Sequence, residues 1–260
     1  MKALLSLAVL FCVVFGADPA LPTINLSLNS PQNAEQLVNS LNVLLILTAL
    51  ALAPSLIFMM TSFLRLVIVF SFLRQAMGTQ QVPPSTVLIS LAMVLTFFIM
   101  EPVGKQSYDE GIKPYIAEQI GYEDMLDKSL KPFKEFMVKN TREKDLALFF
   151  RIRNLQNPAN IEDIPLSIAM SAFMISELKT SFEIAFLLYL PFLVIDMVVS
   201  SVLMAMGMMM LPPVMISLPF KLLIFVLVDG WNLLIGNLVK SFQKIIMIMY
   251  LIYILNFVQK

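Results

Sequence analysis

Seven ionisable side chains lie within or beside long apolar runs, where a charge is costly unless it has a partner or reaches water. They are Arg65, Glu177, Lys179, Glu183, Asp196, Lys221 and Asp229. Such residues form ion pairs between helices, bind an ion or relay protons. Lys179 and Glu183 are four residues apart, so they can meet on one face of a helix. We expect the other ions to find partners on another helix or on another subunit.

Asp196 and Asp229 fall on neighbouring apolar segments, as the proton-sharing carboxylates of an intramembrane aspartyl protease would. The Gly-x-Gly-Asp context of such proteases is absent, because Asp229 is followed by Gly230 and Trp231. The chain has no histidine and a single cysteine, Cys12. It shows no zinc motif, phosphate-binding glycine loop or nucleophilic triad. The sequence therefore predicts no enzyme activity, no cofactor and no metal site.

Methionines gather just before a Leu-Pro-Pro turn. The members of this cluster are Met204, Met206, Met208, Met209 and Met210. Methionine is flexible and polarizable, so it can close around changing shapes. Repeated around a ring of subunits, the cluster would form a soft apolar constriction. Filling of the chain's own core at a helix end is the alternative, and composition alone favours it.

The elements that position these residues are apolar enough to identify a membrane protein. Hydrophobic residues make up 58% of the 260, and the mean hydropathy is +0.83. Three stretches without charge, each long enough for a span of about 20 residues, lie between Glu35 and Arg65, Arg74 and Glu101, and Asp196 and Lys221. In contrast, 21 of the 36 charged side chains lie between Lys105 and Asp163. The net charge is zero, which indicates no general attraction to nucleic acid.

The N-terminus has the pattern of a Sec signal peptide. Lys2 gives a basic start, residues 3–15 are largely apolar, and small residues allow cleavage after Gly16. The next segment, rich in Pro, Asn and Ser, is then expected outside the cytoplasm. An uncleaved signal anchor is the alternative.

This leader sets the expected topology. The first apolar helix enters the membrane and the second leaves it, so that the charged insert lies outside. Arg65 and Arg74 then fall at a cytoplasmic turn, as the positive-inside rule prefers, whereas Lys240 and Lys244 fall on the outer side. This mismatch indicates that the apolar helices are not ordinary lipid-facing spans.

Prolines suggest where the helices bend or end. Pro54 predicts a kink near Ala53 in a first helix that continues to Leu73, and Glu101-Pro102 is expected to close the second. The expected fold is an all-α membrane protein, in which kinked apolar helical hairpins flank a small, mainly helical extracytoplasmic domain. The expected segments are a signal peptide (1–16), a lead-in (17–40), an N-terminal hairpin (41–102), a periplasmic domain (103–163), a C-terminal hairpin with the methionine-rich turn (164–244) and an apolar extension (245–260).

Long stretches of the C-terminal half carry a resemblance to a known family. They are SAFMISELKTSFEIAF at residues 171–186, LPFLVIDMVVSSVLMAMGMMMLPP at 190–213 and LPFKLLIFVLVDGW at 218–231. Together with Pro54, Thr61–Arg65 and Phe72–Arg74, they resemble the FliP family of flagellar export-gate subunits and their virulence type III secretion relatives. The resemblance covers about residues 41–242. The apolar tail from Lys244 to Lys260 extends beyond the usual end of the family.

The resemblance implies a non-enzymatic, protein-conducting role. FliP-like subunits form a ring-like homo-oligomer, a pentamer, and assemble with FliQ and FliR and other export apparatus proteins. Unfolded secretion substrates pass through the centre. The location is the bacterial inner membrane at the flagellar basal body, with the central domain periplasmic, and the apolar hairpins pack largely against partner subunits.

The resemblance also assigns roles to residues. Met208, Met209 and Met210 correspond to a gasket around the substrate path. The expected inter-helix or inter-subunit ion contacts are Arg65, Glu177, Lys179, Glu183 and Asp196. An ion-coupled transporter or channel that uses the intramembrane ions is the alternative function; it should show ion flux with the isolated chain, whereas a gate subunit should co-purify with two small apolar partners.

Overall fold

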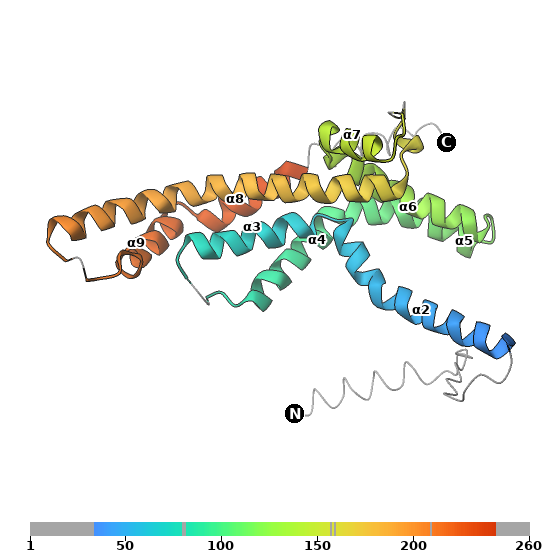
Figure 1. Cartoon of the computed structure of the whole chain (residues 1–260), viewed down its shortest axis with the longest axis horizontal. Coiled ribbons are helices and arrows are strands. Elements are labelled where there is room, and N and C mark those ends of the chain that lie inside the picture. Colours follow the sequence, from blue (N-terminus) through green and yellow to red (C-terminus); the bar gives the residue numbers. More distant parts are fainter. Residues whose placement is uncertain (1–33, 80–81, 157, 159, 209, 243–260) are drawn as a thin grey trace. The chain divides into compact units, whose positions relative to one another are not determined.

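The computed structural model describes residues 34–79, 82–156, 158, 160–208 and 210–242. Within this part of the chain every regular element is a helix (Figure 1), so the predicted all-α class is confirmed. The signal peptide, most of the lead-in and the C-terminal extension lie outside the described residues. The chain divides into two compact units, Met1–Ala51 and Leu52–Lys260. The division into six segments stays a prediction.

The first apolar helix continues through its proline but ends earlier than predicted. α2 (Ala34–Met59) runs unbroken through Pro54, and α3 (Phe63–Ala76) follows after a short break. At the break, the N–H of Met60 donates to both Leu56 and Ile57, and the Thr61 hydroxyl donates to the Phe58 carbonyl at 2.9 Å. Local bonds of this kind compete with helix continuation. The prediction of one helix through to Leu73 is therefore wrong, whereas the kink near Ala53 stays a prediction.

α3 lies at the centre of the second unit. Its residues Leu66, Val69, Phe70 and Leu73 are fully buried, and their spacing is that of one helix face. This face packs mainly against α8 and also against α4 (Ser85–Ser107). α3 therefore forms the inner helix that the longer elements cover.

α4 continues beyond the proline that was expected to end it. Pro102 lies inside the helix, which leads through a π-helical turn (Tyr108–Ile112) into α5 (Lys113–Ile116). Ile99 and Val103, on either side of Pro102, are buried in the core, and α4 packs on α6. Here tertiary packing outweighs the helix-breaking tendency of proline.

The charged insert is helical and packs directly on the apolar part. α6 (Tyr122–Asn140) and α7 (Glu143–Ile152) both contact α8. Phe136 of α6 lies with its ring centroid 6.0 Å from both Phe173 of α8 and Phe242. A short 3₁₀ turn (Ile161–Asp163) leads from the insert into α8. The insert is thus joined to the hairpins through one shared aromatic cluster.

The C-terminal half begins with α8 (Leu166–Ala205), the longest helix (Figure 1). After the methionine-rich turn, α9 (Pro213–Leu227) is followed at a bend of 63° by the last helix of the described part of the chain (Gly230–Phe242), called the last helix below. Gly230 is required at this bend, because a Cβ there would lie 2.3 Å from the Phe225 ring. The described residues contain three helices long and apolar enough to cross a membrane, or four if the bent pair is one span.

One glycine of the insert should not tolerate a side chain. A Cβ on Gly111 would lie 2.1 Å from Ser129 Oγ and 2.8 Å from the Ser129 backbone nitrogen. Because backbone atoms cannot rotate away, we expect Gly111→Ala to lower the free energy of unfolding by about 1–3 kcal/mol. Gly104 has nothing within 4 Å of its Cβ, so Gly104→Ala should stabilise the helix by about 0.5–1 kcal/mol. Equal thermal midpoints for the two variants in mild detergent would contradict this packing.

Candidate functional site

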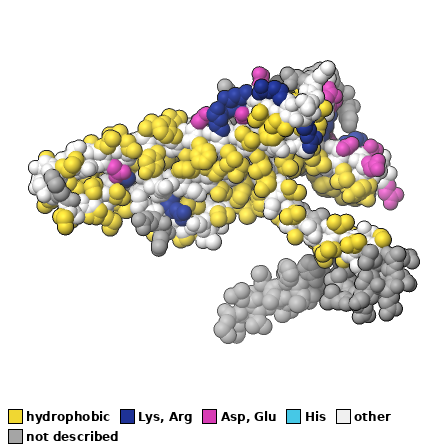
Figure 2. Space-filling view, viewed as in Figure 1, with side chains coloured by type: hydrophobic (Ala, Val, Ile, Leu, Met, Phe, Trp, Pro, Cys, Tyr) yellow, Lys and Arg dark blue, Asp and Glu magenta, His cyan; other side chains and the backbone are white. Residues whose placement is uncertain are grey.

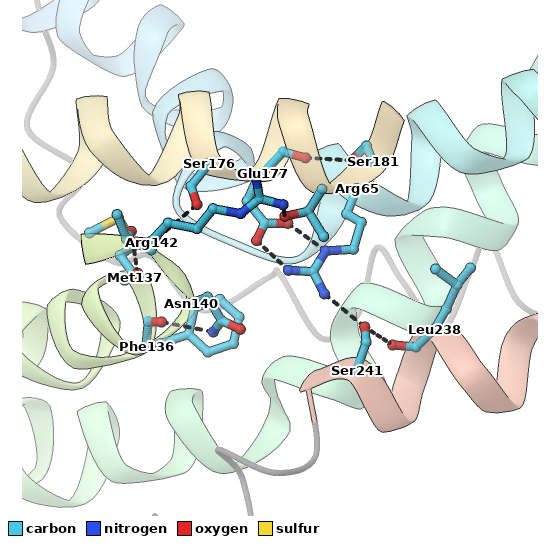
Figure 3. A network of polar contacts seen from close by, with 12 residues as sticks. Arg65, Phe136, Met137, Asn140, Arg142, Ser176, Glu177, Ser181, Leu238 and Ser241 are labelled. Carbon is cyan, nitrogen blue, oxygen red and sulfur yellow. Dashed lines mark hydrogen bonds and ion pairs between the residues drawn. The ribbon is translucent and has the colours of Figure 1, made fainter. Parts of the chain in front are cut away.

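A buried ion pair joins three segments that are far apart in the sequence (Figure 3). Arg65 of α3 donates from Nε to Glu177 Oε2 of α8 at 2.7 Å, and its Nη2 donates to the other carboxylate oxygen. Arg65 Nη1 donates to Ser241 Oγ of the last helix at 2.7 Å. The guanidinium carbon also lies 3.7 Å from the centroid of the Phe242 ring. We call these four residues the Arg65 cluster.

The geometry of the Arg65 cluster is that of a structural contact that holds three helices together. The side chains of Arg65 and Glu177 are 5% and 0% exposed, so neither charge is solvated by water. A two-fold guanidinium–carboxylate contact is among the strongest and most directional of hydrogen-bonded pairs. Since the arginine binds both carboxylate oxygens, the pair has no free oxygen with which to bind a transported ion. It instead fixes how α3, α8 and the last helix lie against one another.

A second ion cluster lies toward the methionine-rich end of the hairpin. Lys221 of α9 donates to Asp196 Oδ2 of α8 at 2.6 Å and to the carbonyl of Ala76 at 3.1 Å. Ala76 is the last residue of α3, where carbonyls lack partners within their own helix and favour a cation. Ser217 Oγ donates to Asp196 Oδ1 at 2.5 Å. We call these four residues the Lys221 cluster; it joins α3, α8 and α9.

The third ion contact joins the insert to α8. Arg142 Nη2 donates to Glu183 Oε2 at 2.5 Å and to Thr180 Oγ1 at 3.2 Å. The backbone N–H of Arg142, just before α7, donates to Ser176 Oγ at 2.9 Å. Sequence spacing suggested Lys179 as a partner of Glu183. The two charges do interact, but the hydrogen bond to Glu183 comes from Arg142 of the insert. Lys179 lies exposed on α8.

The remaining candidates lie at turns. Met208 and Met210 are exposed between α8 and α9, and Met210 is 97% exposed. The alternative that these two fill the chain's own core is therefore wrong. Met209 lies outside the described residues, and the gasket role stays a prediction. Asp229 is exposed at the bend after α9, whereas Asp196 belongs to the Lys221 cluster.

Several contributors to these clusters were missed by sequence reasoning. They are Ser176, Ser217, Ser241, Arg142 and Phe242, none of which stands out by type or spacing. A serine in an apolar helix is too common to predict a contact, and Arg142 is one of many charges in the insert. Among the described residues, no group of three His, Cys, Asp or Glu side chains could hold a metal ion.

The apolar helices leave most of their surface uncovered by the chain itself. Only 11% of the α8 window that could span a membrane is buried, and none of the window in α2. Figure 2 shows hydrophobic side chains spread along the face over α8 and α3. Scattered apolar residues are normal on a protein surface, but a continuous apolar surface marks contact with lipid or with another protein.

Comparison with known proteins identifies the family. Residues 46–238 match the FliP family. The flagellar biosynthetic protein FliP of Bacillus subtilis is 51% identical over 213 residues, which cover 82% of this chain and 96% of the relative. The FliP proteins of Caulobacter vibrioides and Aquifex aeolicus are each 49% identical, over 92% and 80% of this chain and 89% and 87% of their own lengths. The resemblance drawn from the C-terminal motifs is confirmed, and the chain belongs to the FliP family.

Proposed function

We propose that this chain is a subunit of the flagellar type III protein export gate and forms part of the conduit through which unfolded flagellar proteins cross the inner membrane. The observation that carries the proposal is the family match, which covers residues 46–238. The match includes Glu177 and Asp196, the α8 ions of the two clusters, and Glu183 of the third ion contact. The matched relatives are flagellar biosynthetic proteins at 49–51% identity. The proposed role is non-enzymatic.

The dimensions of α8 support a place in an assembly. Its 40 residues make a helix about 60 Å long at 1.5 Å per residue, twice the roughly 30 Å of a bilayer's hydrocarbon core. Lipid can therefore cover only part of this helix, although apolar side chains such as Phe182 and Val202 are exposed along it. The rest needs protein partners. We propose sister copies in a pentameric ring, together with FliQ and FliR, with the insert on the periplasmic side.

The ion clusters argue against the transporter alternative. An ion pathway needs intramembrane charges that can change partners or reach water. Arg65 and Glu177 satisfy each other in a buried two-fold contact, and Lys221 is 2% exposed and bound to Asp196. These charges position helices, as a static scaffold around a conduit requires.

The exposed methionines support the gasket proposal. In a ring, the turn between α8 and α9 would place several copies of Met208, Met209 and Met210 around one opening, where flexible thioethers can close it. We expect the triple alanine variant to leak ions, because alanine leaves the constriction wider. The measurement is membrane conductance or dye entry in cells that express the complex. Unchanged impermeability with normal assembly would count against the gasket.

Deletion and complementation test the function itself. In a flagellated bacterium that lacks its own copy, the wild-type chain should restore secretion of flagellar proteins into the medium. Asp229→Asn is a matched control, because Asp229 is exposed at a turn and only the protease hypothesis needs its carboxylate. This variant should also restore secretion. Secretion that persists without the chain would refute the proposal.

A further inference from the structure

The charges of the insert are strongly divided along its sequence. Residues 108–127 hold six acidic side chains and one basic, whereas residues 128–153 hold eight basic and three acidic. The net charges of the two stretches, −5 (one basic minus six acidic) and +5 (eight basic minus three acidic), cancel, so the net charge of the chain does not reveal the division. A domain with opposite charges on two surfaces has a directional preference for its neighbours.

The first surface is at the α5 and α6 end of the insert. We call it the acidic end; its exposed carboxylates are Glu118, Glu123, Asp124 and Asp127, and the exposed apolar and aromatic residues beside them are Tyr115, Ile116, Tyr122 and Leu126. Ile116 is 67% exposed and Tyr122 is 60% exposed. Lys113 and Lys128 are also exposed there, so four carboxylates stand against two cations. Large side chains this open, beside a surplus of one charge, are typical of a protein–protein contact rather than of a solvated face.

The second surface is formed by α7 and the residues after it. We call it the basic end; its exposed cations are Lys144, Arg151 and Arg153, and its exposed apolar residues are Leu148, Ile152 and Leu155. Figure 2 shows the basic side chains over α7 and acidic ones at the α5–α6 end. Glu143 of α7 is exposed as well, so three cations stand against one exposed carboxylate. Each surface thus combines an apolar part with charges, and the net charges of the two surfaces are opposite.

We propose that the acidic end of one copy contacts the basic end of the next copy, so that the insert sets how neighbouring copies face each other in the ring. This inference rests on the proposed function, which supplies the second copy. A contact between two different surfaces of the same chain repeats from copy to copy and closes into a ring when the rotation fits. The exposed apolar residues form the buried middle of this contact, and the charges form its rim.

Opposite charge also excludes the competing arrangements. A two-fold contact would place acidic end on acidic end or basic end on basic end, which like charges oppose. An anionic membrane surface would attract the basic end but repel the acidic end. A neighbouring copy is the partner that satisfies both surfaces at once.

Charge reversal provides the test. The acidic-end variant carries Glu123→Lys, Asp124→Lys and Asp127→Lys, and the basic-end variant carries Lys144→Glu, Arg151→Glu and Arg153→Glu. Each alone brings like charges together, so we expect at least a roughly tenfold loss of ring on native gels of detergent extracts. The combined variant has six substitutions but restores opposite charges, so it should recover rings. Recovery by the more heavily substituted chain cannot be explained by misfolding.

A charge swap within one chain is the matched control. Lys131 Nζ lies 2.6 Å from Glu162 Oε1, and both side chains are exposed on the insert. Lys131→Glu with Glu162→Lys keeps this pair and should leave assembly unchanged. Single-end variants that assemble like the wild type, or a combined variant that does not recover, would overturn the proposed contact.

Crosslinking locates the contact directly. On a Cys12→Ser background the chain has no other cysteine, so Glu123→Cys and Arg153→Cys together should give a ladder of disulfide-linked copies under oxidation. A chain with either cysteine alone can be linked only into a dimer and should give no crosslinked product; a dimer formed by Glu123→Cys alone would indicate a two-fold contact and overturn the proposal. Flagellar secretion is measured in the same strains. Normal secretion without the expected ladder would reject this contact and leave the proposed function intact.

Discussion

Replacing Arg65 with methionine is expected to lower the free energy of unfolding by about 3–5 kcal/mol, the usual cost of leaving one partner of a buried ion pair alone. The Glu177 side chain is 0% exposed, so water cannot take the place of the guanidinium. The substitution also removes the hydrogen bond to Ser241 and the contact with the Phe242 ring. The thermal midpoint in mild detergent should fall by roughly 10 °C.

The control removes both charges. Arg65→Met combined with Glu177→Leu leaves no unpaired ion, and replacing a buried pair with apolar residues is often neutral or stabilising. We therefore expect this variant to unfold near the wild-type midpoint. If the double variant is as unstable as Arg65→Met, the loss of stability comes from packing around the arginine, and the ion pair is not what holds these helices together.

Lys221→Met is expected to have the second largest effect, a loss of about 2–4 kcal/mol. It leaves the Asp196 carboxylate with Ser217 only and frees the carbonyl of Ala76 at the end of α3. The cost should be smaller than for Arg65, because the Asp196 side chain is 28% exposed and can gain some hydration. Thermal unfolding in the same detergent gives the comparison.

Lys221→Arg serves as the matched control for charge. It keeps the positive charge but not the compact shape that reaches both Asp196 and Ala76. An intermediate loss of stability is expected. Lys221→Met with wild-type stability would show that α9 is held by its apolar contacts alone.

Sequence patterns predicted the class of the protein well, because apolar length and charge placement are direct consequences of the membrane setting. They also selected the ions that form the clusters. Arg65, Glu177 and Asp196 are conspicuous because charges are rare in apolar helices, and each has a partner on another helix in the structure. What spacing could not supply was the partner itself, since Arg65 and Glu177 are separated by 112 positions.

The errors arise where a local sequence signal is outweighed by tertiary contacts. Pro102 was expected to end the second apolar helix, but α4 continues through it. Proline propensity is a local effect of a few kcal/mol, which burial of the flanking residues Ile99 and Val103 can offset in α4. Helix spacing also selected Lys179 for Glu183, and the two charges do interact, but the hydrogen bond comes from Arg142, which reaches Glu183 from a segment that sequence spacing cannot place.

The exposed methionines show a second limit of sequence patterns, which concerns where apolar side chains lie. Composition favoured a role in the chain's own core, yet Met204, Met206, Met208 and Met210 are all exposed. A sequence cannot distinguish apolar residues that fill a subunit from those that face another subunit. The structure of the single chain makes that distinction through the surface that it leaves uncovered.

The mass of the intact complex tests the account most directly. The chain is extracted from flagellated cells in mild detergent through an affinity tag, and native mass spectrometry gives the number of copies and the accompanying proteins. We predict a complex with several copies of this chain and two smaller apolar partners, extracted from cells that secrete flagellar proteins. A single copy without partners, from cells with normal secretion, would contradict the claim that sister copies cover these helices to form a conduit.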